Sequence, residues 1–328
     1  MKDGTMLDVR GLTVTLPTET VGITALDGIS FDVKPGEVLG IVGESGAGKS
    51  IAGAAIIDLL VPPLKRTAGA ITLAGERIDH LDAQAMRKVR GRRIGYVFQD
   101  PMTSLNPVLT VGRQLIDTMR AHLDITRGMA RRKAAEWLDR VGLPNPRETL
   151  ARYPHELSGG MRQRVVIALA LCADPVLLIA DEPTTALDVS VQAHILQLLR
   201  DLHEESGISM ILITHDLGVV SKMADRVAVF YAGRVAEIST VTELFEDPRH
   251  PYAEGLLQAT PRPSLTGRGH VIQQIPGVMP ALGKIPGGCA FHPRCSRASE
   301  ACRTRVPELR EEGGRSYSCF HPIGGKAQ

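Results

Sequence analysis

The sequence predicts an α/β fold with a mostly parallel sheet, an inserted helical subdomain and a loop-rich C-terminal appendage that contains four cysteines. Short apolar segments alternate with helical segments over most of the chain, and a glycine-rich loop joins one of them to the next helix. Prolines become frequent after about residue 246. We expect residues 1–98 and 161–245 to form the two parts of the core, 99–160 the helical subdomain, and 246–328 the appendage.

Apolar periodicity predicts each element in order. Polar and apolar residues alternate in the first strands, whereas continuous apolar runs such as 176–180 are typical of strands buried in a parallel sheet. The predicted strands are 7–9, 12–16, 29–33, 38–42, 70–75, 93–98, 176–180, 208–213 and 226–231. Apolar residues at helical spacing predict helices over 51–60, 130–141, 161–173 and 191–205.

Composition limits the class of protein. The chain has 328 residues, 43% of them hydrophobic, and a net charge of +2, so it lacks the strong positive charge of a protein that coats nucleic acid. The first 25 residues show no basic segment followed by an apolar one, and the longest apolar stretches are too short to span a bilayer. We therefore expect a cytosolic protein, or one that reaches a membrane through partners.

The glycine-rich loop, GESGAGKS, fits the pattern G-x-x-x-x-G-K-S/T and lies between a predicted strand and a predicted helix. In that setting backbone N–H groups can surround phosphate oxygens, the Lys49 ammonium can reach the outer phosphates, and the Ser50 hydroxyl can bind Mg²⁺. The alternative is a glycine-rich turn with an incidental lysine. We expect nucleotide contacts from Gly43, Glu44, Ser45, Gly46, Ala47, Gly48, Lys49 and Ser50.

Two acidic residues follow the apolar strand 176–180 directly. Ligands of α/β proteins bind at the carboxyl ends of strands, so Asp181 is placed to bind Mg²⁺ through water. Glu182 points differently and can polarise a water molecule for in-line attack on the γ-phosphate. The alternative is a strand followed by an ordinary acidic turn.

Several shorter motifs occur in a fixed order along the chain. Taken alone, Ser158 ahead of a helix predicts only an N-cap. The order is the phosphate loop, Gln99 after a strand, Leu157-Ser158-Gly159-Gly160, Asp181-Glu182, Ala186-Leu187-Asp188 and His215. This combination resembles the ATP-binding cassette (ABC) ATPases over residues 5 to about 245. The resemblance implies a phosphate-loop core in which an antiparallel β subdomain accompanies the mostly parallel sheet.

The resemblance implies a role in ATP hydrolysis for each matching position. Lys49 and the loop amides would hold the β- and γ-phosphates, and Glu182 would be the general base. His215 would contact the γ-phosphate, although a capping or buried hydrogen-bonded histidine is the alternative. The implied Mg²⁺ ligands are Ser50, Gln99 and Asp181, and the implied catalytic residues are Glu182, His215 and Gln99.

The same resemblance implies that two cassettes enclose two ATP molecules. The residues that would contact the nucleotide of the opposite subunit are Ser158, Gly159, Gly160 and Asp188. The family usually has glutamine after the Leu-Ser-Gly-Gly motif, whereas this chain has Met161, so one hydrogen bond from that position is lost. The serine hydroxyl and glycine amides remain, and we expect γ-phosphate binding to survive.

Adenine recognition departs from the family pattern as well. The family often stacks an aromatic ring on adenine upstream of the phosphate loop, and residues 7–30 contain no phenylalanine, tyrosine or tryptophan. Only aliphatic side chains such as Leu16, Val21 or Ile23 remain to pack against the base. We therefore expect weak selectivity for adenine.

Motifs near the C-terminus narrow the resemblance. The chain is similar to the ATPases of dipeptide/oligopeptide permeases, which belong to the peptide/nickel importers. The matching segments are His250–Leu257 (HPYAEGLL), Gly288–Cys295 (GCAFHPRC) and Met161–Arg164 (MRQR). The resemblance implies import, with two transmembrane subunits, a second and usually different ATPase chain, and an extracytoplasmic peptide-binding protein as partners.

Four of the five cysteines cluster in the appendage, with the spacing C-x5-C-x6-C-x16-C. Zinc sites typically use closely paired cysteines. The wider spacing and the resemblance favour a 4Fe–4S cluster held by Cys289, Cys295, Cys302 and Cys319, with zinc or free structural thiols as alternatives. His292 and His321 lie near these positions and could replace a ligand, whereas Cys172 lies on an apolar helix face and is expected in the core.

These inferences predict an Mg²⁺-dependent ATPase subunit of an ABC importer for di- or oligopeptides, bound peripherally at the cytoplasmic face of the inner (plasma) membrane. Nickel or another small solute is the alternative cargo. A soluble ABC ATPase of DNA repair or translation is the alternative from another class; it would carry coiled-coil insertions or a second cassette. A redox-sensing tail that alters the ATPase rate is a third hypothesis. We expect no nucleic-acid partner.

Overall fold

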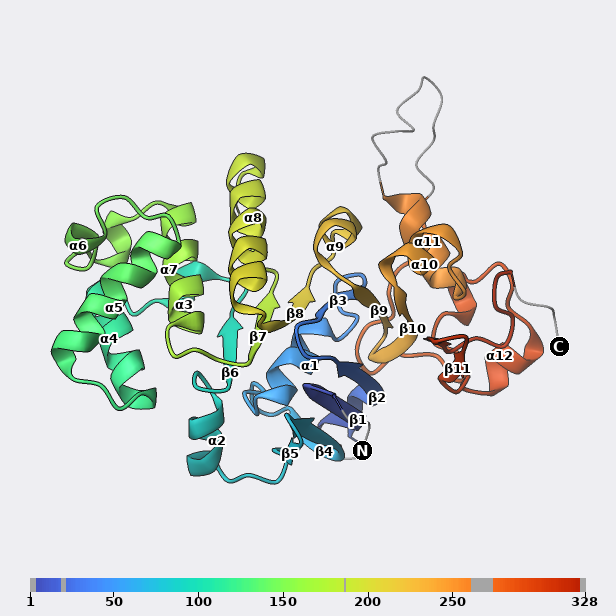
Figure 1. Cartoon of the computed structure of the whole chain (residues 1–328). Coiled ribbons are helices and arrows are strands. Elements are labelled where there is room, and N and C mark those ends of the chain that lie inside the picture. The colour runs from blue at the N-terminus through green and yellow to red at the C-terminus, as the bar shows by residue number, and fades with distance from the viewer. Residues whose placement is uncertain (1–3, 19–21, 186, 261–273, 325–328) are drawn as a thin grey trace, which may run out of the picture. The chain divides into compact units, whose positions relative to one another are not determined.

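The computed structural model describes residues 4–18, 22–185, 187–260 and 274–324. The chain forms two compact units, of which the first combines Met1–Asp79 with Ile213–Gln328 and the second is His80–Leu212. Figure 1 shows the elements of each unit along the chain. Within the described ranges, none of the helices combines the length and the apolar character that crossing a bilayer requires.

Four strands of the first unit form an antiparallel sheet in the order β2-β1-β4-β5 (Figure 1). Their bounds are β1 Leu7–Leu16, β2 Ile23–Val33, β4 Lys65–Leu73 and β5 Glu76–Arg77. β1 runs through two segments that the sequence predicts as separate strands, because Gly11, with a φ of 57°, lies at an irregularity in the pairing with β2 rather than at a break. This sheet is the antiparallel subdomain that the family resemblance implies.

A second ladder of the first unit contains the strand that leads into the phosphate loop. β3 (Val38–Val42) pairs in parallel with β9 (Arg226–Tyr231), and β10 (Arg234–Thr240) pairs antiparallel with β9. All five residues of β3 are buried, as its continuous apolar sequence predicts. β10 was not predicted, although its centre is buried throughout.

The appendage adds a hairpin to this ladder. β12 (Arg315–Tyr317) pairs with β10, and β11 (Arg310–Glu312) pairs with β12 across the two-residue turn of Gly313 and Gly314. Both turn residues have positive φ, which the short turn demands and glycine permits. The sequence predicted loops here, because the two strands are polar and short and lack an apolar alternation.

The described residues of the first unit also form the helices α1 (Lys49–Ile56), α9 (Leu217–Met223), α10 (Val241–Glu246), α11 (Pro251–Ala259) and α12 (Glu300–Thr304). Local capping sets several of their starts. Asp216 accepts the N–H groups of two first-turn residues of α9, and Thr240 forms a reciprocal capping box with Glu243 in α10. Pro251 occupies the first turn of α11, where its missing N–H costs no helical hydrogen bond.

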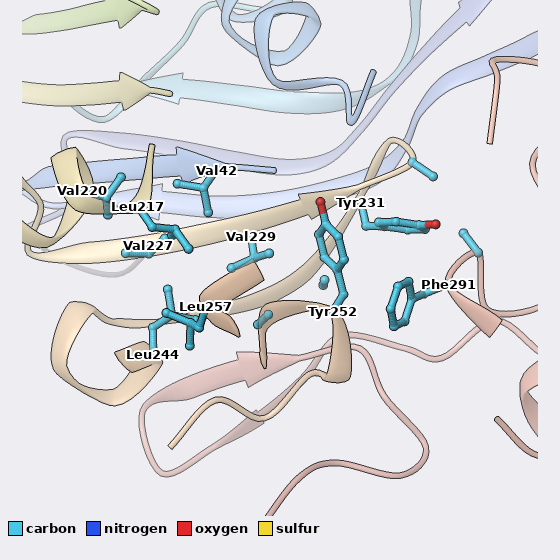
Figure 2. Packing of buried hydrophobic residues seen from close by; sticks show 14 residues of the cluster. Val42, Leu217, Val220, Val227, Val229, Tyr231, Leu244, Tyr252, Leu257 and Phe291 are labelled. Atoms are coloured by element: carbon cyan, nitrogen blue, oxygen red, sulfur yellow. The ribbon is translucent and has the colours of Figure 1, made fainter. Parts of the chain in front are cut away.

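An aromatic cluster fixes the appendage to the ladder. Tyr231 of β9, Tyr252 of α11 and Phe291 meet with ring centroids 4.6, 5.2 and 5.3 Å apart, and Figure 2 shows the three rings beside the aliphatic side chains of the same core. All three are almost fully buried. Each such pair contributes about 0.5–1.5 kcal/mol beyond the burial of its area. The tail segments around residues 252 and 291 are therefore integral to the first unit.

The second unit contains the remaining strands and most of the helices. β6 (Ile94–Val97) pairs in parallel with β7 (Leu177–Asp181), and β8 (Ser209–Ile213) is the next strand after β7. Its helices are α2 Ala83–Val89, α3 Pro101–Ser104, α4 Val111–His122, α5 Arg127–Arg140, α6 Pro146–Thr149, α7 Gly159–Leu171 and α8 Val189–Ser206.

The long helices of this unit begin slightly before their predicted starts. The prediction placed each start at the first apolar residue, but the capping side chain sets it in the structure. Thr126 caps α5, Ser158 caps α7 and Asp188 caps α8, each by accepting a backbone N–H of the first turn. A cap of this kind contributes about 1 kcal/mol.

Candidate functional site

The phosphate loop follows β3 and leads into α1, as the motif requires. Gly43 packs so closely on the backbone of Phe230 that a Cβ atom there would clash with its carbonyl oxygen. Gly48 is the N-cap of α1 with a φ of 99°, a conformation that favours glycine, and no side chain caps the helix. The loop therefore has the conformation that only its glycines permit, and it presents a helix N-terminus whose dipole favours an anion.

Lys49 lies inside this loop with 5% of its surface exposed. Its Nζ donates hydrogen bonds to the carbonyl oxygens of Gly43 (2.8 Å) and Glu44 (3.2 Å). A buried ammonium needs such partners because desolvation of an unpaired charge is costly. The loop thus holds a positive charge at its centre, which is the charge that a polyphosphate requires.

Glu44 of the phosphate loop is held by residues of the appendage. Arg294 donates from Nη1 and Nη2 to the two carboxylate oxygens, at 3.0 and 3.2 Å. The Glu44 backbone N–H donates to the Tyr252 hydroxyl at 2.9 Å. No sequence pattern predicts that Arg294 and Tyr252 contact Glu44, although both lie in tail motifs that carry the permease resemblance.

A cavity of about 430 Å³ lies in the first unit beside this loop. Leu26 and Gly233, the chain neighbours of the lining residues Asp27 and Arg234, lie close to Gly48, where an added Cβ would come within 2.7 Å and 3.4 Å of them. Among the described residues that line the cavity, none is aromatic. They are Gly22, Ile23, Thr24, Asp27, Ala232, Arg234, Gly283, Ile285 and Pro286.

The cavity contains one of the three aliphatic residues that the sequence predicts to pack against a nucleobase. Ile23 lines it, Leu16 is not among its lining residues, and Val21 lies outside the described residues. Arg234 and Asp27 form an ion pair on its wall, with Nε and Oδ2 2.9 Å apart. The wall therefore consists of aliphatic and charged groups. The appendage contributes Gly283, Ile285 and Pro286 to this wall.

The acidic pair lies at the end of β7 in the second unit. Asp181 is buried and accepts a hydrogen bond from the Tyr96 hydroxyl of β6 at 3.0 Å. Burial, reinforced by the Asp181 charge, raises the pKa of Tyr96, so the phenol stays a donor. Tyr96 was not identified from the sequence, since its position in a strand carries no motif.

Glu182 has two side-chain donors in the same unit. Gln99 donates from Nε2 at 3.0 Å and Thr185 from Oγ1 at 2.7 Å, both to Oε2. Glu182 also has a φ of 45°, an uncommon conformation for a residue with a side chain and one that occurs often at functional sites. The structure thus brings together the predicted Glu182 and Gln99 and adds Thr185, which sequence reasoning missed.

The residues predicted to act across a dimer form caps within this chain. Ser158 Oγ accepts the Met161 N–H at 3.3 Å, and Asp188 Oδ1 accepts the Val191 N–H at 2.9 Å. Gly160 packs against α8, where a Cβ would come within 2.8 Å of Val191. The local interpretation of Ser158 as an N-cap is confirmed, and contacts to a second cassette stay a prediction.

His215 follows β8 and is exposed, directly before the cap residue Asp216 of α9. The alternative of a buried histidine is therefore wrong.

The predicted Mg²⁺ ligands come from both units: Ser50 belongs to the first unit, whereas Gln99 and Asp181 belong to the second. The Mg²⁺ set that the resemblance implies stays a prediction.

The four tail cysteines line a single pocket, together with His292 and His321. Burial raises the pKa of Cys289, Cys295 and Cys319, in the last case to about 12, so their thiols are protonated in the absence of a cation. Within the described part of the chain, no group of three or more His, Cys, Asp or Glu side chains is arranged to hold a metal ion. Four cysteine thiols are suitable ligands for a metal centre. Their arrangement in the structure, however, gives no support to the predicted iron–sulfur cluster.

The remaining cysteine has the role that the sequence predicts. Cys172 is fully buried at the C-terminal end of α7. Burial raises the pKa of its thiol to about 12, which leaves it protonated and inert.

Comparisons with known proteins agree with these features. A family model described as ABC transporter matches residues 26–185, and one described as oligopeptide/dipeptide transporter, C-terminal region, matches residues 236–302. The ABC cassette MJ0796, solved as a dimer in a post-hydrolysis state with ADP and Pi, is similar with a TM-score of 0.65 and 31% identity; the match covers 72% of this chain and 99% of that one. CbiO1 from Clostridium perfringens, part of the transporter complex cbiONQ, is similar with a TM-score of 0.64 and 31% identity, over 75% and 92% of the two chains.

Relatives extend over almost the whole chain. A putative peptide import ATP-binding protein of Brucella melitensis biotype 1 is 49% identical over 314 residues, which are 93% of each chain. A probable peptide ABC transporter ATP-binding protein of Sinorhizobium fredii is 47% identical over 317 residues, 96% of this chain and 94% of the relative. The chain therefore belongs to the ABC transporter family, among the ATP-binding proteins that carry the oligopeptide/dipeptide transporter C-terminal region.

Proposed function

We propose that this ABC ATPase hydrolyses ATP to energise the import of di- or oligopeptides through separate membrane subunits. One observation carries the choice of cargo: the similarity to peptide import ATP-binding proteins continues through the C-terminal region, in which the chain also matches the oligopeptide/dipeptide transporter family. That region is packed into the first unit through Tyr252 and Phe291, so it is a structural part of the protein.

The phosphate loop is the proposed site for the ATP phosphates. Lys49, once its ammonium turns from the carbonyl oxygens of Gly43 and Glu44, neutralises the β- and γ-phosphates, and the loop amides and the N-terminus of α1 bind the remaining oxygens. The cavity lined by Ile23 and Arg234 is the proposed place of the base, because Gly48 of the loop lies close to Leu26 and Gly233, which neighbour the lining residues in the chain. Its aliphatic and charged wall supports weak selectivity between purines.

The acidic end of β7 is the proposed hydrolytic side. Glu182 acts as the general base that takes a proton from the attacking water, and the hydrogen bonds from Gln99 and Thr185 hold its carboxylate in place. A bound Mg²⁺ supplies charge neutralisation at the phosphates. Its proposed ligands are Ser50, Gln99 and Asp181, and His215 is proposed at the γ-phosphate.

Assembly with a second cassette completes the proposal. Ser158, Gly159, Gly160 and Asp188 are proposed to contact the ATP of the opposite subunit. In the permeases that this chain resembles, that subunit is usually a different ATPase chain. The other proposed partners are two transmembrane permease subunits and, indirectly, an extracytoplasmic peptide-binding protein. The protein then lies peripherally at the cytoplasmic face of the inner membrane.

The four tail cysteines are a proposed 4Fe–4S site with a structural or regulatory role, and zinc is the alternative. The chemistry of four thiols, the usual ligand set of such clusters, supports the proposal. Iron, acid-labile sulfide and zinc are to be measured on anaerobically purified protein. Four irons with sulfide support the cluster, one zinc without sulfide replaces it, and the absence of both makes the cysteines structural.

Mass spectrometry of proteins that co-purify with the chain from detergent-solubilised native membranes tests the assembly. We expect two polytopic subunits, a second cassette and a peptide-binding protein. A nickel-binding protein in place of the last would change the cargo. Recovery with DNA-repair or ribosomal proteins and without membrane proteins would overturn the transporter while leaving the ATPase chemistry intact.

A further inference from the structure

One arginine of the appendage, Arg294, binds the side chain of a phosphate-loop residue and lies directly before Cys295. We infer that Arg294 is a positioning residue of the nucleotide site: it neutralises Glu44 and fixes the loop in the conformation that receives the ATP phosphates. The inference rests on the proposed role of this loop in ATP binding. It assigns to the C-terminal region a direct part in nucleotide affinity.

The geometry of the pair is that of a strong, directed contact. Both terminal nitrogens of Arg294 donate to Glu44, one to each carboxylate oxygen, at 3.0 and 3.2 Å. The Arg294 side chain is only 5% exposed and that of Glu44 31% exposed. Bidentate arginine–carboxylate pairs combine charge with a fixed orientation, and partial burial protects them from screening.

Glu44 is held at its backbone as well. Its N–H donates to the Tyr252 hydroxyl at 2.9 Å, and its carbonyl oxygen accepts from Lys49 at 3.2 Å. The appendage thus fixes Glu44 at its side chain through Arg294 and at its backbone through Tyr252. The conformation of the neighbouring loop amides follows from these contacts.

Arg294 is itself oriented before any ligand binds. Its Nε donates to the Pro276 carbonyl oxygen at 2.8 Å, and its guanidinium lies 5.8 Å from the ring centroid of Tyr231 and 5.9 Å from that of Phe291. Backbone hydrogen bonds from Arg294 to Phe291 and from Cys295 to His292 close the short helical turn that presents it. The cysteine segment therefore sets the position of the arginine.

Electrostatics explains why the loop needs this partner. Glu44 places a negative charge in a loop that receives a polyanion, and an unpaired carboxylate there repels phosphate. Paired with Arg294, the carboxylate is locally neutral. Loss of Arg294 alone leaves the repulsion, whereas loss of both charges removes it. A residue that only stabilises the fold would not show this dependence on Glu44.

A double-mutant cycle on the full chain tests the inference, with the dissociation constant of a fluorescent, non-hydrolysable ATP analogue as the readout. Arg294→Met is expected to weaken binding about tenfold, since one charge of a partly buried pair is left alone. Glu44→Gln alone is expected to change affinity by less than about threefold, because this variant leaves no negative charge in the loop to repel the phosphates. The double variant is expected to bind like Glu44→Gln, which is a rescue.

Controls separate the inference from folding and from the proposed function. Arg303→Met removes a tail arginine that is 64% exposed, and it is expected to leave affinity unchanged. Melting temperatures report stability separately. Wild-type affinity in Arg294→Met, or a double variant as weak as Arg294→Met, overturns the inference. Failure of the wild-type chain to bind the analogue would instead refute the proposed role of the loop.

Discussion

The phosphate loop and the acidic end of β7 carry opposite charges and are built in different ways. Lys49 finds its hydrogen-bond acceptors, Gly43 and Glu44, within its own loop. Glu182 finds a donor, Gln99, 83 positions earlier in the chain, at the end of the neighbouring strand β6. A short stretch of sequence therefore supplies the acceptors of Lys49, whereas the pairing of β6 and β7 in the second unit brings Gln99 to Glu182. Substitutions should separate binding from turnover in the same way.

The largest expected effect is at Glu182. Glu182→Gln keeps the shape and the hydrogen-bond acceptor but removes the base, so the turnover number of ATP hydrolysis should fall about 10³-fold. The dissociation constant for ATP should stay within about threefold, because the loop is untouched. Phosphate release and equilibrium binding measure the two quantities. Full turnover in this variant would show that another group is the base.

Lys49→Ala addresses the binding side. Removal of the buried ammonium should weaken ATP binding about 100-fold, the effect expected when one partner of a buried charge pair is lost. The readout is the dissociation constant of the fluorescent ATP analogue. Lys222→Ala, outside the loop, serves as the control. Equal affinities of Lys49→Ala and wild type would place the phosphates elsewhere.

A substitution at Thr185 should affect hydrolysis and not ATP binding, because Thr185 contacts Glu182 and lies outside the phosphate loop. Thr185→Val removes the hydroxyl that donates to the Glu182 carboxylate at 2.7 Å. Turnover should fall about tenfold, the effect of losing one charge-assisted hydrogen bond, with unchanged affinity. Thr185→Ser retains the hydroxyl and should restore most of the rate. A Thr185→Ser variant as slow as Thr185→Val would assign the effect to packing.

The smallest expected effect concerns the base. Because Ile23 and charged residues line the cavity beside the loop, ATP and GTP should bind with dissociation constants within about fivefold of each other. Planar bases gain about 1–3 kcal/mol from stacking on an aromatic ring, and this wall offers none among its described residues. Competition between the two nucleotides for the loop measures the ratio, and a strong preference for ATP would contradict the assignment of the cavity.

The two regions also differ in how far the sequence could predict them. The glycines that permit the conformation of the phosphate loop stand at fixed spacing between a strand and a helix, all within one short segment. Buried strands such as β7 follow from their apolar runs. The contact of Glu182 with Gln99 depends on the parallel pairing of β6 and β7, which no local pattern encodes.

The structure of the appendage was the hardest to predict, because its contacts join residues that lie far apart in the chain. Its hairpin of β11 and β12 is polar, and its pairing with β10 depends on a distant strand. The ion pair of Glu44 and Arg294 joins residues 250 positions apart. The tail motifs include both Tyr252 and Arg294, but only their hydrogen bonds to Glu44 show that they lie at the loop.

The central claim is that ATP hydrolysis by this chain energises peptide import. Uptake of a radiolabelled dipeptide by cells whose own copy of the chain is replaced by Glu182→Gln tests it most directly. We expect uptake to fall to the level of cells without the chain, although the variant is present at wild-type amounts and binds ATP. Undiminished uptake in these cells would contradict it.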